Sequence, residues 1–217
     1  MSKPQILEIP PLTPHGKGYR ITFEKQDASA QKKALCKEDA AQLSALYEQI
    51  QEDPKTHSEK LQQLSLRCGS VPEIDNLLAF ALLKTGKRKE AELLIEKTWE
   101  KHPDYLIGQI NYADQALRLG KKERVPAIFK ECFDLSRLYP ERETFHFSEF
   151  RGFMVVMGFY HLATLQKEKA EEYYQLAFQV DPLHPSVSAL EKALSRRSFL
   201  KEIFARIQAL FRISLAR

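Results

Sequence analysis

The stretch LLAFALLKTGKRKEA, residues 77–91, decides the fold. It joins two amphipathic helical patterns through Gly86, a residue that readily ends a helix because it can adopt positive φ. Gly86 and Gly120 are 34 residues apart, and Ala91 and Val125 have the same spacing. A period of 34 residues with a break in its middle is typical of units built from two antiparallel helices. The sequence therefore predicts stacked helical hairpins.

A third copy of this pattern follows after an insertion. Pro103 and Pro182 are 79 residues apart, and so are Ala91 and Ala170. That distance is two periods plus 11 residues, which places the insertion near residues 140–150. Small residues recur where neighbouring helices must approach each other closely, namely Ala79, Ala113, Gly158, Ala91, Ala170 and Ala177. On these residues the chain resembles the tetratricopeptide repeat family over roughly half of its length.

The resemblance implies an all-α fold, a tetratricopeptide-like array of helical hairpins wound as a right-handed superhelix. We expect an extended N-terminal arm over 1–35, the array over 36–195 and a basic amphipathic helix over 196–217. The units of the array are expected near 38–71, 72–105, 106–150 and 151–184, followed by a capping helix. The expected helix pairs are 72–85 with 88–101, 105–119 with 122–138, and 149–165 with 168–180.

The first 35 residues do not follow the helical pattern. The run 6–9 is apolar, and Tyr19, Ile21 and Phe23 alternate with polar residues at the period of a strand. These features predict one strand or two. The arm could be a detachable binding segment, but apolar termini are usually held by the rest of the chain, so we favour an arm that packs against the first helices.

Positive charge is concentrated at the C-terminus. Residues 196–217 hold six basic residues and one acidic residue, whereas the whole chain has a net charge of +4. Apolar residues fall on one side of this predicted helix: Phe199, Leu200, Ile203, Phe204, Ile207, Leu210 and Phe211. We favour packing on the end of the array, then self-association or insertion into a partner, then contact with an anionic membrane surface. Nucleic acid is not expected, because the aromatic residues do not alternate with the basic ones.

Motif searches argue against catalysis. The three cysteines form no Cys-x-x-Cys pair, and the N-terminus lacks the apolar core of a secretion signal, so we expect a reduced protein in the cytoplasm. The apolar run 152–160 is too short to span a bilayer. His146 and Glu149 could share a helix face, but no third ligand has metal spacing. We predict no catalytic residue, metal or cofactor, and hence a non-enzymatic protein.

The resemblance also implies a binding surface, because members of the family bind peptides on the concave side formed by the first helix of each unit. At the corresponding positions we expect Asn76, Phe80, Leu83, Lys84, Ile107, Ile110, Asn111, Asp114, Leu117, Val155, Phe159 and Leu162. Members that clamp a C-terminal carboxylate carry polar residues where this chain has Phe80, Gly152 and Val156. The predicted groove is therefore apolar, which suits an amphipathic helix, an extended hydrophobic segment or one of the chain's own termini.

We therefore interpret the chain as a protein-binding module with another protein as its partner. One alternative is a dedicated chaperone that shields an apolar segment of a secreted or assembling protein, as some small proteins resembling this one do. The other is a peripheral membrane adaptor that uses the C-terminal helix.

Overall fold

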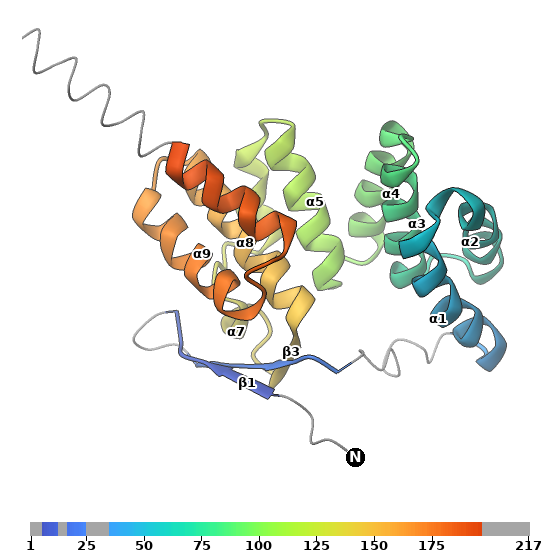
Figure 1. The fold of residues 1–217 in the computed structure, drawn as a ribbon, viewed down its shortest axis with the longest axis horizontal. Coiled ribbons are helices and arrows are strands. Elements are labelled where there is room, and N and C mark those ends of the chain that lie inside the picture. The colour runs from blue at the N-terminus through green and yellow to red at the C-terminus, as the bar shows by residue number, and fades with distance from the viewer. Residues whose placement is uncertain (1–5, 13–16, 25–34, 197–217) are drawn as a thin grey trace, which may run out of the picture. The chain divides into compact units, whose positions relative to one another are not determined.

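The structure is a computed structural model that describes residues 6–12, 17–24 and 35–196 (Figure 1). The chain divides into two compact units. The described part of unit 1 comprises residues 23–24 and 35–132, and that of unit 2 comprises 6–12, 17–22 and 133–196. The boundary at Cys132 falls inside the segment 106–150 that the sequence predicts as one repeat. Each unit is described below by itself.

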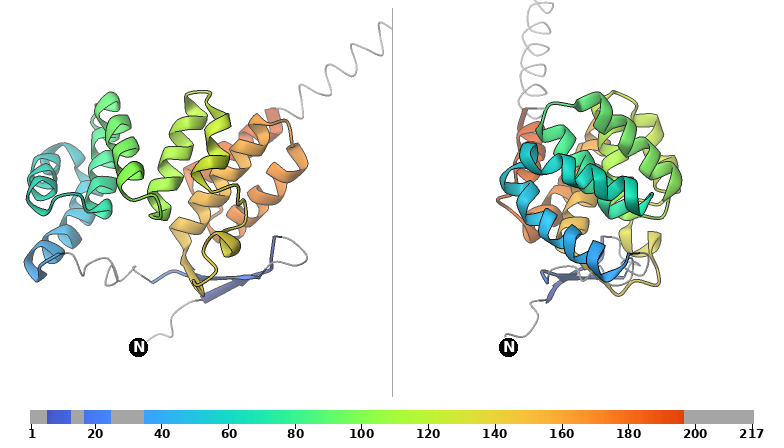
Figure 2. Two further views of the ribbon diagram at one scale, coloured as in Figure 1. Left: turned by 180° about the vertical axis from the view of Figure 1, so that it is seen from behind. Right: turned by 90° about the vertical axis from the view of Figure 1, so that its right-hand side faces the viewer.

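Unit 1 is built from antiparallel helices joined by short turns (Figures 1 and 2). Its elements are α1 (Lys37–Glu52), α2 (Pro54–Cys68), α3 (Pro72–Lys84), α4 (Arg88–Lys101), α5 (Leu106–Arg118), the 3-10 helix η2 (Lys122–Arg124) and α6 (Val125–Ile128). Asp53 separates the first pair, and its carboxylate caps α2 by accepting hydrogen bonds from the backbone N–H groups of Lys55 and Thr56, both at 3.1 Å. Pro54 starts α2, a position where proline loses no helical hydrogen bond.

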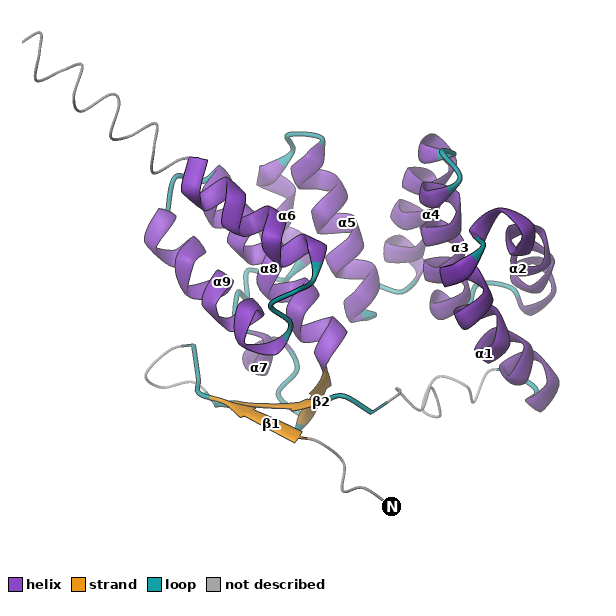
Figure 3. Cartoon of the chain, viewed as in Figure 1, coloured by secondary structure: helices purple, strands orange, loops and turns teal. Residues whose placement is uncertain are grey.

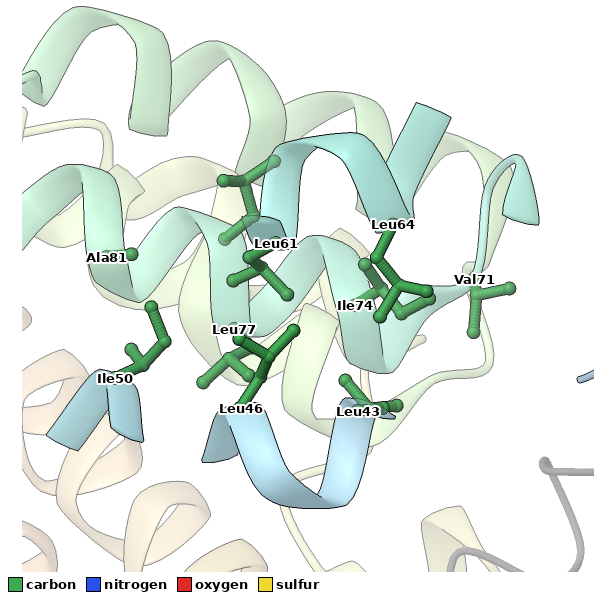
Figure 4. Packing of buried hydrophobic residues seen from close by; sticks show 10 residues of the cluster. Leu43, Leu46, Ile50, Leu61, Leu64, Val71, Ile74, Leu77 and Ala81 are labelled. Atoms are coloured by element: carbon green, nitrogen blue, oxygen red, sulfur yellow. The ribbon is translucent and has the colours of Figure 1, made fainter. Parts of the chain in front are cut away.

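The core of unit 1 is an aliphatic cluster between α1, α2 and α3 (Figure 4). Ile50, Leu61 and Leu64 are completely buried. The other members are Leu43, Leu46, Val71, Ile74, Leu77, Leu78 and Ala81. Side chains of this size stabilise the fold by roughly 1.5–3 kcal/mol each when fully buried. The first hairpin is thus packed against the second and belongs to the same array.

Unit 2 combines a helical hairpin with a small sheet. Its elements are β1 (Ile6–Ile9), β2 (Tyr19–Thr22), α7 (Leu135–Leu138), β3 (Thr144–His146), α8 (Phe147–Ala163), α9 (Lys167–Val180) and a further helix over residues 185–196. The strands lie in the order β1-β2-β3 (Figure 3). The β1–β2 pair is antiparallel, with Leu7 opposite Ile21, whereas β2 and β3 are parallel, with Ile21 opposite Phe145.

Aromatic side chains attach this sheet to the helices of unit 2. The Tyr19 ring lies edge-on to Phe150, with 5.0 Å between the ring centroids, and its hydroxyl donates to Asp134 Oδ1 at 3.0 Å. Asp134 Oδ1 also accepts from the Ser136 backbone N–H at 2.9 Å, which caps α7. The predicted N-terminal strands are therefore present, but they pack in unit 2 on β3 and α8. The expected packing against the first helices is wrong, because residues 144–146 supply a strand that the sequence pattern did not reveal.

Three equivalent turns close the hairpins of the two units. Gly86, Gly120 and Leu165 all have left-handed backbones, with φ of 80°, 74° and 67°. The N–H group of the next residue bonds the carbonyl five residues back: Lys87 to Leu82 at 2.9 Å, Lys121 to Ala116 at 2.8 Å and Gln166 to His161 at 2.8 Å. This is the Schellman pattern of helix termination. Leu165 follows Gly86 by 79 residues, the spacing that the proline and alanine pairs also show.

The predicted helices 72–85, 88–101, 105–119, 149–165 and 168–180 are present to within two residues or so at either end. The predicted continuous helix 122–138 is wrong. It is broken between α6 and α7, where Lys130 and Glu131 have φ of 52° and 57°. The physical reason is Asp134, whose side chain bonds its own backbone two residues on and competes with helix formation.

Candidate functional site

The best candidate for a site is the face formed by the first helices of the hairpins in unit 1, α1, α3 and α5, which we term the first-helix face. Its centre is polar. Asn111 Nδ2 on α5 donates to Asn76 Oδ1 on α3, and both side chains are partly exposed. An amide carries donors and a carbonyl acceptor, so this pair retains hydrogen-bonding capacity after the two side chains have met. The pair therefore offers the functional groups needed to bind a peptide backbone.

Apolar side chains flank the asparagine pair along α3 and α5. Phe80 is half-buried and packs against the aliphatic core, and the Lys84 ammonium lies 5.5 Å from the centre of its ring. Leu83 is 40% exposed, while Ile107 and Leu117 are half-buried. Asp114 accepts a hydrogen bond from Arg118 Nε at 2.8 Å. In unit 1, the predicted residues therefore form an apolar surface that has charged side chains near one end.

Three of the predicted residues are core residues. Ile110 is 7% exposed, and Val155 and Leu162 are each 5% exposed. The expectation that they line a surface is corrected accordingly, because apolar residues at helical spacing pack in a core more often than they face a ligand. Phe159 is half-buried on α8 and belongs to unit 2.

Tyr47 on α1 is a member of this face that the sequence prediction missed. It is 39% exposed, whereas its helical pattern groups it with the buried Leu43, Leu46 and Ile50. Burial of its hydroxyl, followed by the charge of Glu73, raises its pKa to about 12, and a hydrogen bond with Asn76 opposes that shift. Tyr47 therefore extends the polar centre from α5 and α3 to α1. An aromatic residue within an apolar stripe gives no sequence signal that separates it from the core.

A second polar cluster connects two loops in unit 1. The Ser70 hydroxyl donates to Asp75 Oδ2 at 3.3 Å and lies 3.0 Å from His102 Nε2, while Ser65 donates to Asp75 Oδ1 at 3.1 Å. Burial raises the pKa of Asp75 and of Glu73 beside it. The serine lies between the carboxylate and the imidazole, whereas nucleophilic catalysis requires the histidine to lie between the other two. The arrangement fits a structural link from the α2–α3 loop to the end of α4.

His146 and Glu149, the pair weighed as metal ligands, form the cap of α8. Glu149 Oε2 accepts from the His146 backbone N–H at 3.1 Å and binds Arg142 Nη2 at 2.6 Å, and Ser148 Oγ lies 2.7 Å from His146 Nδ1. This is a capping box, with histidine in the place of the usual serine or threonine. Across the described residues, no group of three or more histidine, cysteine or acidic side chains is arranged to hold a metal ion.

The predicted C-terminal helix residues, Phe199 to Phe211, lie outside the described residues. Among the helices that the structure describes, none has the length and hydropathy to cross a bilayer.

The helical hairpins and the 34-residue spacing of the turns at Gly86 and Gly120 define the class by fold alone: a tetratricopeptide-like array of helical hairpins. No protein-family model and no curated sequence matches the chain. Among solved structures, MamA (41-end) from Desulfovibrio magneticus RS-1 is similar, with 16% sequence identity and a TM-score of 0.48 over 80% of this chain and 96% of that one. A MamA RS-1 ArsTM double mutant is similar at 15% identity and a TM-score of 0.48, over 82% of this chain and 98% of that one.

Proposed function

We propose that the protein is a non-enzymatic binding module whose first-helix face holds a peptide or an amphipathic helix of another protein. The observation that carries the proposal is the hydrogen-bonded pair Asn76–Asn111, which lies partly exposed across two neighbouring helices. An extended peptide presents one N–H and one C=O group per residue, and side-chain amides can bind both. Phe80 and Leu83 provide apolar surface for the side chains of the same ligand.

The positive charge of unit 1 indicates which ligands the first-helix face would prefer. Exposed Lys84, Lys87 and Lys89 surround the α3–α4 turn, and exposed Lys121 lies at the next turn. Arg118 and Glu92, 3.8 Å apart, connect the end of α5 to the start of α4, so these turns lie at the same edge of the unit. A ligand with apolar residues followed by acidic ones would fit this surface best.

The test starts from a pull-down with the full-length chain, followed by mapping of the captured partner to a short peptide. Asn111→Ala and Phe80→Glu should each weaken binding of that peptide at least tenfold while helix content, measured by circular dichroism, stays near wild type. Leu66→Glu is the matched control, because Leu66 is 80% exposed on α2, away from the first helices. Equal binding by all folded variants would contradict the proposal.

A further inference from the structure

Two thiols, those of Cys36 and Cys68, lie at the open end of the first hairpin in unit 1, and each contacts Asp39. Cys36 immediately precedes α1, and Cys68 is the last residue of α2, so the antiparallel pair brings them to the same end. The Asp39 backbone N–H donates to Cys36 Sγ at 3.4 Å, and Cys68 Sγ donates to Asp39 Oδ2 at 3.4 Å. Both sulfur atoms therefore contact Asp39, Cys36 at its backbone N–H and Cys68 at its carboxylate.

The surroundings give the two thiols different reactivity. Cys36 is exposed and occupies the N-cap of α1. Cys68 is partly buried, and burial together with its hydrogen bond to Asp39 raises the pKa of its thiol. The Arg67 guanidinium binds the Asp39 carboxylate and Gln42, which holds in place the carboxylate that accepts from the Cys68 thiol. A reagent in solution therefore reacts first with the thiol of Cys36.

We propose that Cys36 and Cys68 form a redox-active pair that closes to a disulfide by exchange with a small disulfide such as oxidised glutathione. The Cys36 thiolate attacks one sulfur of the oxidant, forming a mixed disulfide and releasing one thiolate. Cys68 then attacks Cys36 Sγ, which forms the protein disulfide and releases the second thiolate. The two protons of the protein thiols end on the two released thiolates. The protein pair is oxidised and the small disulfide is reduced to two thiols.

The bond would join the start of α1 to the end of α2 and close a loop between residues 36 and 68. Such a bond restricts the unfolded chain, so the first hairpin should open less readily in the oxidised protein. Because α1 carries Tyr47, oxidation would also make the first-helix face more rigid. The redox inference does not depend on the proposed binding function, since it rests on the sulfur contacts alone.

The experiment uses the reduced full-length protein carrying Cys132→Ser, which keeps only the two thiols in question. After incubation with oxidised glutathione, intact mass spectrometry should show the loss of two hydrogen atoms with no glutathione retained, and peptide mapping should find the Cys36–Cys68 bond. Thermal unfolding should shift upward by several degrees, and excess dithiothreitol should reverse both changes. Cys68→Ser in the same background should retain one glutathione on Cys36, because no second thiol can displace it.

A matched reaction uses the wild-type chain, folded and in guanidinium chloride. The folded protein should form the Cys36–Cys68 bond in clear preference to pairs with Cys132, and that preference should disappear on unfolding. Retention of glutathione on Cys36 of the folded Cys132→Ser protein, with no internal bond, would overturn the proposal. So would pairs with Cys132 formed as readily as the Cys36–Cys68 bond in the folded chain.

Discussion

The α3–α4 hairpin of unit 1 and the α8–α9 hairpin of unit 2 use the same turn with different residues. Gly86 makes the turn in the first and Leu165 in the second, yet their φ values are 80° and 67° and their hydrogen bonds match. Leucine in this left-handed conformation costs roughly 1–2 kcal/mol, whereas glycine adopts it freely. The comparison teaches that packing of the two helices fixes the turn, and that the residue in it only adjusts the stability.

The two hairpins also differ in the polar side chains that are buried on their first helices. On α3 the buried polar groups are the carboxyls of Glu73 and Asp75, whereas on α8 they include the imidazole of His161. In addition, α8 contains Gly158, where the corresponding positions of unit 1 hold Ala79 and Ala113. Unit 2 therefore packs more closely at this point, and its first helix buries a titratable base, His161, in addition to the acid Glu149.

The largest effect should come from filling the space at Gly158. A Cβ atom there would lie 2.5 Å from Leu190 Cδ2, so Gly158→Leu should lower the free energy of unfolding by roughly 2–3 kcal/mol. Guanidinium denaturation followed by circular dichroism measures this change. Leu190→Ala in the same chain should recover part of the loss, because it removes the atoms that a larger side chain would displace. An unchanged transition in Gly158→Leu would mean that the residues 185–196 do not pack there.

The next effect concerns Asp134, which has no counterpart in the α3–α4 hairpin. Asp134→Ala removes the acceptor of Tyr19 and Ser136, and leaves their hydroxyls to find new partners. We expect a loss of about 2 kcal/mol, against about 1 kcal/mol for Tyr19→Phe, which removes only one donor. Amide hydrogen exchange should accelerate in β2, where Ile21 is fully buried. Unaltered exchange in β2 would show that this contact does not hold the sheet on unit 2.

The buried titratable groups should make the two hairpins respond oppositely to pH. Burial raises the folded-state pKa of Glu73 and Asp75, so the stability linked to them is fully present below about pH 4 and declines as the pH rises through the folded values. Burial lowers the pKa of His161, and the charge of Lys169 also lowers it, while a hydrogen bond with Gln166 opposes the shift. The stability linked to His161 is therefore present above about pH 6.5 and declines as the pH falls below it.

Two substitutions separate these contributions. Glu73→Gln should gain stability relative to wild type, and the gain should be larger near pH 7 than near pH 4, about where an unburied Glu73 would titrate. His161→Phe should reduce the loss of stability below about pH 6.5, because phenylalanine keeps an aromatic ring against Tyr173 but cannot be protonated. Free energies of unfolding across this pH range test both expectations. Glu59→Gln, at an exposed position on α2, serves as the control, and parallel curves for all four proteins would refute the assignment.

Local sequence signals predicted the helix pairs, whereas the structural features that depend on tertiary contacts were not predicted from the sequence. Glycine and proline breaks placed α3 and α4 correctly, because those residues act on the backbone alone. The strand at 144–146 depends on β2, which is distant in sequence and pairs with it only in the folded chain, where Tyr19 also contacts Phe145. At the candidate site, the repeat register placed Asn76 and Asn111 on the same face without predicting their hydrogen bond, and no spacing rule identified Tyr47.

The smallest expected effect concerns the turns at Gly86 and Leu165, and it tests whether these two turns are equivalent. Leu165→Gly should stabilise unit 2 by about 1 kcal/mol, because the left-handed backbone no longer strains a side chain, and Leu165 is 73% exposed and so loses little packing. Gly86→Leu should destabilise unit 1 by about the same amount, since its backbone is left-handed and nothing lies within 4 Å of a Cβ atom there to clash with it. Chemical denaturation measures both, and the double variant should restore the wild-type value if the sites are independent. A loss of stability in Leu165→Gly would show that the leucine makes a contact that offsets its strain.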